Sequence, residues 1–357
     1  MKKITYADLH QEFVECKEMS SAIDRCIANS SFINGPEVQK FEQDWATYTN
    51  SDACAGVSSG TSALMLALLA VGVKPGDHVI VPSMSFISTA EVVSQIGAIP
   101  VFADIDNYYL LDLLHVKSLI TDRVRAIIFV DLYGQTIDIE YLRTIAPGIP
   151  LIQDAAQSAG CKYLNRPIGN LVHATCFSFY PGKNLSAIGD AGAVTGPKHI
   201  VDQVKLLKDH GRREKYVHEV VGWNERMDGI HAAVLTAKIP YLDCWNQRRI
   251  DNANVYRTEL QFVDKIKLPT VNSVSSHVYN QFVITLQNRD ALREFLLSKD
   301  IETGIQFPLA MHQQPVYKTT LKLPIAEHLA AHCLSLPIHP HMTKQDVVRV
   351  CNAIKEF

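Results

Sequence analysis

The sequence predicts an α/β protein built on a mostly parallel β-sheet. Short apolar runs typical of buried strands recur through its first half, and segments with helical periodicity separate them. Strands that alternate with helices favour parallel pairing, because the connecting helices then cover both faces of the sheet. The chain has 357 residues, 47% of them hydrophobic and 20% charged, so it is long enough for a sizeable core and two domains.

The N-terminal part of the chain is expected to be helical. Hydrophobic spacing predicts an amphipathic helix over 11–29, which the segment Phe32–Pro36 ends, and a second helix over 37–48. A buried helix is expected over 63–71, because that stretch is almost wholly apolar. Apolar runs predict strands over 53–57, 78–82, 101–103, 126–130, 150–152, 174–179 and 191–194.

The second half of the chain is expected to contain more helices. We expect a helix over 201–210 with Gly211 as its C-terminal cap, another over 231–237, and a long helix running towards Leu260. The polar segment 211–228 is expected to be mobile. The remaining predictions are strands over 278–286 and 305–309 and helices over 290–298 and 346–357.

Composition and cysteine spacing exclude several classes of protein. The net charge of −3 gives no electrostatic argument for binding nucleic acid or an anionic membrane. The N-terminus lacks the apolar run of a signal peptide, and no stretch approaches ~20 uninterrupted apolar residues, so no membrane span is predicted. The eight cysteines include no CxxC pair, so no metal site is predicted, and free thiols indicate a cytoplasmic location.

Lys183 lies in an unusual place for a lysine. It follows Pro181-Gly182 in a tight turn between two apolar runs and has no neighbouring acid in the sequence. Most lysines are solvated surface charges, but desolvation lowers the pKa of a lysine and makes it a nucleophilic amine suited to Schiff-base chemistry. A phosphate-binding P-loop does not fit, because Phe177 and Asn184 stand where that motif needs Gly and Ser or Thr.

Asp154 falls at the end of the strand expected at 150–152. Open α/β sheets bind ligands at that edge, although an acid followed by small residues is equally typical of a helix N-cap. Paired with Lys183, Asp154 suggests pyridoxal 5′-phosphate (PLP). The lysine would hold the aldehyde carbon, and the aspartate would keep the pyridine nitrogen protonated so that the ring can act as an electron sink.

A third stretch, VSSGTSAL over 57–64, ends a strand and begins the apolar helix. Backbone N–H groups and hydroxyls at a helix N-terminus bind anions, so Gly60 and Thr61 are candidates for holding a phosphate. An ordinary capping turn has the same pattern. It is the combination of this turn with Asp154 and Lys183 that favours PLP.

These stretches resemble those of the DegT/DnrJ/EryC1/StrS family of PLP-dependent sugar aminotransferases, within the fold type I superfamily. The similarity runs from about Phe32 to Met342 and includes FINGPEVQKFE, SSGTSAL, VIVPSMSFISTAE, DAAQSAG, FSFYPGKNL, NERMDGIHAAVL and LSLPIHP. The resemblance implies a mostly parallel seven-stranded sheet flanked by helices. It also implies a large PLP-binding domain over residues 1–240 and a smaller α+β domain over 241–357.

The resemblance also implies roles for further residues. Phe86 would stack on the PLP ring, although an aromatic residue there is more often part of a core. Gln157 would contact the ring hydroxyl, and Ser178 would bind the phosphate with Gly60 and Thr61. His312 matches a histidine near the family's active site, but a structural role is about as expected.

The match at Asn224 implies a contact to the cofactor and also an assembly of two subunits. It matches an asparagine that, in the family, reaches the phosphate of the partner subunit's PLP, so a homodimer with shared active sites is expected. From the residues alone, Asn224 is a turn residue. The family also places basic residues near the substrate's diphosphate, and the candidates are Arg212, Arg213, Lys215 and Arg226.

The implied reaction is transfer of an amino group from L-glutamate to a nucleotide-linked keto sugar, with the freed Lys183 as general acid and base. The segment Lys215–Asp228 resembles that of sugar 3-aminotransferases, so a dTDP-3-keto-6-deoxyhexose is the expected substrate. The product would be a 3-amino sugar for surface polysaccharide or a related glycan. A 4-aminotransferase is the main alternative. The presence of Lys183 disfavours a dehydratase, and the lack of a DNA-binding segment disfavours a PLP-binding regulator.

Three positions depart from the family pattern. Asp131 stands where a histidine is common, Gln153 where an acid is common, and Ala191 where a glycine is common. None of these changes removes a group expected to bind PLP. Asp131 alters the polarity expected near the substrate, so the exact sugar stays open.

Overall fold

The computed structural model describes residues 3–317 and 319–357, and its centre is the mostly parallel seven-stranded sheet that was expected. The strand order is β1–β9–β8–β5–β4–β2–β3, and β9 alone runs antiparallel to its neighbours. The strands are β1 (Ala53–Val57), β2 (His78–Pro82), β3 (Ile99–Ala103), β4 (Val124–Val130), β5 (Leu151–Asp154), β8 (Ala174–Ser178) and β9 (Gly192–Gly196).

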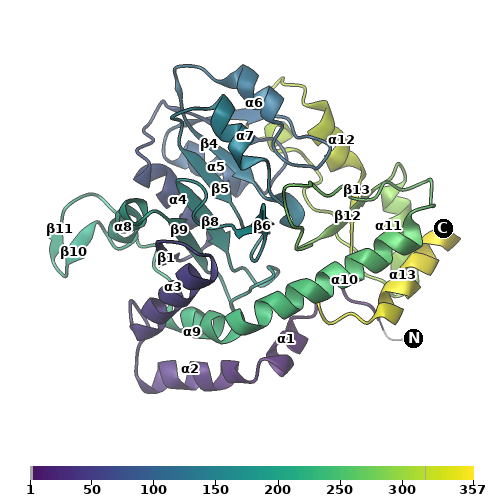
Figure 1. Cartoon of the computed structure of the whole chain (residues 1–357), viewed down its shortest axis with the longest axis horizontal. Coiled ribbons are helices and arrows are strands. Elements are labelled where there is room, and N and C mark those ends of the chain that lie inside the picture. The colour runs from purple at the N-terminus through teal and green to yellow at the C-terminus, as the bar shows by residue number, and fades with distance from the viewer. Residues whose placement is uncertain (1–2, 318) are drawn as a thin grey trace.

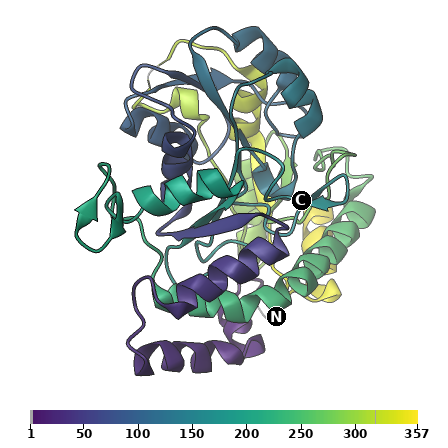
Figure 2. The same cartoon turned by 60° about the vertical axis from the view of Figure 1, so that its left-hand side comes forward.

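Helices flank this sheet, as Figures 1 and 2 show. They are α3 (Pro36–Tyr48), α4 (Gly60–Ala70), α5 (Ser88–Gln95), α6 (Leu113–Leu119), α7 (Ile139–Ile145), α8 (Lys198–Leu207) and α9 (Gly229–Lys238). Helix α4 is apolar on every side because it packs against β8, β9, α5 and α8 at once. Its first turn therefore lies at the edge of the sheet, next to the end of β8.

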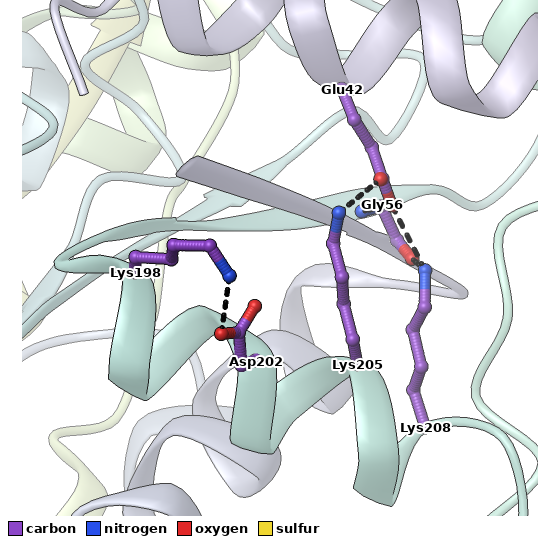
Figure 3. A network of polar contacts seen from close by, with 6 residues as sticks. All are labelled: Glu42, Gly56, Lys198, Asp202, Lys205 and Lys208. Carbon is purple, nitrogen blue, oxygen red and sulfur yellow. Dashed lines mark hydrogen bonds and ion pairs between the residues drawn. The ribbon is translucent and has the colours of Figure 1, made fainter. Parts of the chain in front are cut away.

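A polar network fixes the strand that leads into α4 (Figure 3). The Glu42 carboxylate accepts a hydrogen bond from Gly56 N at 2.9 Å and pairs with Lys205 at 2.6 Å and Lys208 at 3.1 Å. The Lys208 ammonium also donates to Gly56 O at 2.5 Å. Burial alone would raise the pKa of Glu42, but the two ammonium groups hold it below its usual range. The network joins α3, β1 and α8.

The C-terminal part of the chain forms a second hydrophobic core around a two-stranded antiparallel sheet. Tyr256 and Phe282 pack there with ring centroids 4.8 Å apart. Helix α10 runs from the large sheet to this core and packs on α13 (Figure 1). The elements are α10 (Leu242–Leu260), β12 (Phe282–Thr285), α11 (Arg289–Ser298), α12 (Pro324–His332), β13 (Cys333–Leu336) and α13 (Lys344–Glu356).

Helix α12 joins the first core rather than the second, since its residues Ala326 and Leu329 pack there. The carboxylate of Asp104, just after β3, accepts hydrogen bonds from the first-turn N–H groups of Ile325 at 3.1 Å and Ala326 at 2.9 Å. This cap ties the C-terminal part to the large sheet. The division into 1–240 and 241–357 stays a prediction.

Two of the elements expected from the sequence were wrong. The helix expected over 11–29 is two helices, α1 (Leu9–Glu15) and α2 (Glu18–Ala28), because Cys16 leaves helical geometry and is buried against α9. The strand expected over 305–309 is absent, because Phe307 has φ of 63°, which no strand permits. The segment 211–228 contains a short hairpin of β10 (Arg212–Glu214) and β11 (Val217–His218), which projects from the molecule (Figures 1 and 2), and its expected mobility stays a prediction.

Short elements complete the chain. They are β6 (Lys162–Tyr163), β7 (Arg166–Pro167) and the 3₁₀ helices Leu132–Gly134, Ile239–Tyr241 and Met311–Gln313. In the described ranges 3–317 and 319–357, no helix is long and apolar enough to cross a membrane.

Candidate active site

Asp154 and Lys183 lie at the carboxyl edge of two neighbouring parallel strands. Asp154 is the last residue of β5, and Lys183 follows β8 on a turn closed by a hydrogen bond from Lys183 N to Tyr180 O at 2.9 Å. Each of the two charges shifts the pKa of the other, so the two side chains lie near one another. This is the edge at which open α/β sheets bind ligands.

The carboxylate of Asp154 is buried and held on both oxygens. Thr89 donates to one oxygen at 3.0 Å and Ala156 N to the other at 3.2 Å. Burial raises the pKa of Asp154, while these donors and the Lys183 charge oppose the rise. A positively charged ligand atom beside this carboxylate would replace the stabilisation by water that the ionised carboxylate loses on burial.

The Lys183 side chain has no polar partner among the described residues: it makes neither a hydrogen bond nor an ion pair. Desolvation lowers the pKa of its ammonium, and the charge of Asp154 opposes that shift. A desolvated amine without a partner is available for covalent bonding to a carbonyl carbon. This is the environment that the sequence predicted for Lys183.

Buried asparagines hold the turn that carries Lys183. Asn184 donates to Asn246 Oδ1 at 2.7 Å and to Val278 O at 3.1 Å, and it accepts from Asn280 at 2.9 Å. Asn280 also donates to Gly182 O at 3.4 Å. The C-terminal part of the chain therefore sets the position of the lysine. Sequence reasoning missed Asn246 and Asn280, because no local pattern marks a contact that spans more than sixty residues.

The first turn of α4 contacts the end of β8 directly. A Cβ atom at Gly60 would lie 2.6 Å from the Cβ atom of Ser178, so only glycine fits there. Ser59 caps the helix by accepting from Ser62 N at 3.0 Å, and Thr61 shares a hydrogen bond with Ser88 at 2.8 Å. The structure thus brings Gly60, Thr61 and Ser178 together at a helix N-terminus, where backbone N–H groups are free to bind an anion.

Glu225 is a further residue at this turn that sequence reasoning missed. Its carboxylate accepts hydrogen bonds from Ser58 Oγ and, at 2.5 Å, from Ser62 Oγ. Ser58 N donates to Glu225 O at 3.2 Å. The segment containing Asn224 is therefore fixed against the start of α4.

Gln157 is buried, whereas Phe86 is exposed. The Gln157 carbonyl accepts from Tyr133 N at 2.6 Å, while its amide nitrogen has no hydrogen-bond partner within the described chain. Phe86 is 58% exposed, with its ring centroid 6.2 Å from that of Phe307. An aromatic residue at this position is more often part of a core, but the exposed ring of Phe86 is not. Phe86 borders a cleft of about 510 Å³ whose other lining residues are 85, 87, 305–309, 311 and 314–316.

Asn224 is exposed, and its side chain makes no hydrogen bond in the described parts of the chain. Three of the basic residues expected near the substrate's diphosphate are held in ion pairs within the chain. Asp209 pairs with Arg212 at 3.1 Å and with Arg226 at 2.7 Å, and Arg213 pairs with Glu219 at 3.2 Å. His312 is buried and 3.2 Å from Glu327, which fits a structural role.

The residues present fit PLP as a ligand. The site offers an unpartnered amine at Lys183, a buried carboxylate at Asp154 and an anion-binding turn at Gly60. It also offers an amide donor at Gln157 and an exposed aromatic face at Phe86. These are the groups needed to bind an aldehyde, a ring nitrogen, a phosphate, a ring hydroxyl and the face of a pyridine ring.

Comparison with known proteins identifies the family. The model of the DegT/DnrJ/EryC1/StrS aminotransferase family matches residues 14–355. The chain belongs to this family. It is 39% identical to the erythromycin biosynthesis sensory transduction protein EryC1 of Saccharopolyspora erythraea, covering 99% of both chains. It is 38% identical to the dTDP-3-amino-3,4,6-trideoxy-alpha-D-glucose transaminase of Streptomyces venezuelae, covering 99% of this chain and 96% of that one.

A solved structure confirms the fold. The crystal structure of S. venezuelae DesV in complex with a ketimine intermediate superposes with a TM-score of 0.97 at 38% identity, covering 100% of this chain and 98% of that one. The protein is therefore an aminotransferase of fold type I, as the sequence predicted.

Proposed function

We propose that this protein is a PLP-dependent aminotransferase that moves an amino group from L-glutamate to a nucleotide-linked keto sugar. The observation that carries the proposal is the pairing of Lys183 with Asp154. An unpartnered, desolvated amine lies near a buried carboxylate at the ligand-binding edge of the sheet, in a chain of the aminotransferase family. Lys183 makes no hydrogen bond or ion pair among the described residues that would otherwise explain its desolvation.

The cofactor would be held at five points. Lys183 would bind its aldehyde carbon and Asp154 its ring nitrogen. The remaining contacts would be Gly60, Thr61, Ser178 and Asn224 of the partner subunit to the phosphate, Gln157 to the ring hydroxyl and Phe86 to the ring face. When bound, PLP supplies an electron sink for the bond that breaks at the substrate carbon.

The chain's own residues would move the proton. The lowered pKa of Lys183 leaves a larger share of this amine neutral near pH 7, so it can accept a proton from the substrate carbon and return it on the cofactor side. Thr89 keeps the Asp154 carboxylate in place while the charge on the ring changes. The buried asparagines fix the turn of Lys183 so that its amine returns to one position after each transfer.

We propose a dTDP-3-keto-6-deoxyhexose as the acceptor. The segment Lys215–Asp228 resembles that of sugar 3-aminotransferases, and the S. venezuelae relative is a dTDP-3-amino sugar transaminase by name. None of the described residues lining the cleft beside Phe86 is charged. If the sugar ring binds in this cleft, the lack of a cation there favours an apolar 6-methyl group over the carboxylate of a sugar acid.

Product NMR tests this proposal. The holoenzyme is incubated with L-glutamate and, separately, with 3-keto and 4-keto dTDP-6-deoxyhexoses. Because a misplacement of ~1 Å can lower a rate ~100-fold, amination should occur at C3 only. Amination of the 4-keto sugar alone would instead establish the 4-aminotransferase. If neither sugar is aminated and the protein retards DNA in a gel, the protein is a PLP-binding regulator. EryC1, a relative, is named a sensory transduction protein.

We also propose a homodimer with shared sites. The exposed Asn224 side chain and the projecting hairpin, with Tyr216 81% exposed and Val221 86% exposed, leave polar and apolar groups for a second copy of the chain to cover.

Mixing inactive variants should restore activity if the sites are shared. In a mixture of equal amounts of Lys183→Ala and Asn224→Ala chains, half of the dimers would be mixed, and each would hold one intact site. The mixture should therefore regain about one quarter of the wild-type rate. Subunit exchange is checked by native mass spectrometry with an isotope-labelled chain. Full exchange without any recovered rate would show that each site uses residues of one chain only.

A further inference from the structure

A second buried carboxyl group, Asp131, lies directly beside the strand that ends at Asp154. Asp131 follows β4, which pairs with β5, and Asp131 N donates to Asp154 O at 3.0 Å. The Asp131 side chain has no exposed surface. Asp131 is therefore in the protein interior at this edge of the sheet.

Polar groups from the neighbouring segment converge on one oxygen of Asp131. Its Oδ2 accepts from Gln153 Nε2 at 2.8 Å and from Ser158 Oγ at 2.7 Å. Gln153 is itself held, because Thr175 donates to its carbonyl at 3.2 Å. Asp131 thus bridges the two ends of the segment 153–158, and that segment carries both Asp154 and Gln157.

The same segment is held at a third point. Tyr133 N, two residues beyond Asp131, donates to the carbonyl of Gln157 at 2.6 Å. Tyr133 adopts φ of 64°, an uncommon conformation for a non-glycine residue, which the surrounding contacts must maintain. Residues 131–133 therefore act as one clamp on the two side chains that we propose to contact the cofactor ring.

The charge state of Asp131 follows from what surrounds it. Its Oδ1 is buried without any hydrogen-bond partner, and no cation forms an ion pair with it in the described chain. The titratable groups that face it are Asp154 of β5 and the thiol of Cys161. Burial raises the pKa of Asp131 to about 7, the hydrogen bonds from Ser158 and Gln153 oppose the rise, and the charge of Asp154 adds to it. An ionised Asp131 would be an uncompensated buried charge.

We propose that Asp131 is a positioning residue that, as a neutral acid, holds the segment carrying Asp154 and Gln157 in place. The part of the proposal that concerns the cofactor rests on the proposed function. The part that concerns the charge of Asp131 does not, because it can be measured on the cofactor-free protein.

The pH dependence of thermal unfolding tests the charge state. The carboxyl of an unfolded aspartate ionises near pH ~4, whereas Asp131 in the folded chain keeps its proton to about pH 7. Between these values the folded state binds the extra proton, so its stability falls as the pH rises and levels off above the folded pKa. The melting temperature of wild type should therefore fall relative to that of Asp131→Asn between about pH 5 and pH 8. The exposed control Asp122→Asn should follow the wild-type curve.

If the melting temperatures of wild type and Asp131→Asn change with pH in parallel, Asp131 is not a neutral acid in the folded protein, and the proposal is wrong. Ser158→Ala provides an independent check. It removes a donor that favours the ionised form, so the fall in melting temperature should move to higher pH. An unchanged position of that fall would also contradict the proposal.

Cofactor binding tests the clamp. PLP is titrated into the cofactor-free protein at neutral pH, and its absorbance gives the dissociation constant. Asp131→Asn keeps an oxygen to accept from Gln153 and Ser158 and should bind within about threefold of wild type, whereas Asp131→Leu removes the acceptor and should bind about tenfold more weakly. Equal losses in both variants would mean that the ionised carboxylate is the working form and would overturn the proposal. So would equal binding by all three proteins. If the leucine variant does not fold, Ser158→Ala takes its place, with a smaller loss in the same direction.

Discussion

Replacement of Lys183 by alanine should abolish turnover and leave the protein folded. The side chain makes no hydrogen bond or ion pair among the described residues, and its ammonium is desolvated, so its loss removes no stabilising contact. General acid–base catalysis by one group commonly contributes ~10²–10⁴-fold to a rate, and the covalent bond to the cofactor would be lost as well. The variant should therefore unfold at or above the wild-type temperature while its amine transfer falls by at least ~10²-fold.

The site of covalent attachment can be measured directly. Borohydride reduction of the wild-type holoenzyme should fix the cofactor to the chain, and peptide mass spectrometry should find the label on Lys183. Lys198→Ala is the matched control, because Lys198 is an exposed lysine whose partner is Asp202 at 2.6 Å (Figure 3). It should retain full activity. Label on another lysine would show that the assignment of Lys183 is wrong.

Local sequence patterns were sufficient to predict most of the sheet. The strand expected at 78–82 is β2, and that at 53–57 is β1, because each is a short apolar run between turn residues. The missed features depend on tertiary contacts. Nothing local in FPLA (307–310) reveals that Phe307 turns to a positive φ beside Phe86, and nothing in VECKE (14–18) reveals that Cys16 leaves its helix to be buried against α9.

The candidate site also has a part that local sequence predicts and a part that it does not. Lys183, Asp154 and Gly60 each stand in a local sequence that is unusual for that type of residue, and the structure brings all three to one edge of the sheet. Their supports were not predictable. Thr89 bonds to Asp154 across 65 residues of sequence, and Asn280 to Asn184 across 96. Hydrogen bonds between such distant residues leave no periodic signal in one sequence.

Replacement of Lys238 by methionine should strongly destabilise the protein. The Lys238 ammonium donates to Glu12 at 2.6 Å and to Ser186 O at 2.7 Å, and both charged side chains are at least nine-tenths buried. Ser186 Oγ also donates to Glu12 at 3.0 Å. This network joins α1 and α9 to the segment that follows Lys183. Removal of one partner leaves the Glu12 carboxylate buried without a counter-charge, which should lower the free energy of unfolding by about 3–5 kcal/mol.

Two further variants separate the buried charge from the loss of a side chain. The double variant Glu12→Leu/Lys238→Met removes both charges and leaves apolar groups of similar size, so it should recover much of the lost stability. Lys198→Met breaks the exposed pair with Asp202, which should change stability by less than about 0.5 kcal/mol because solvent screens such pairs. Urea denaturation of all three variants against wild type measures these differences. If the double variant were less stable than Lys238→Met, the uncompensated charge of Glu12 would not be the cause. The effect of Lys238 would then come from its hydrogen bonds to Ser186 and from its position 5.5 Å from the centre of the Trp245 ring.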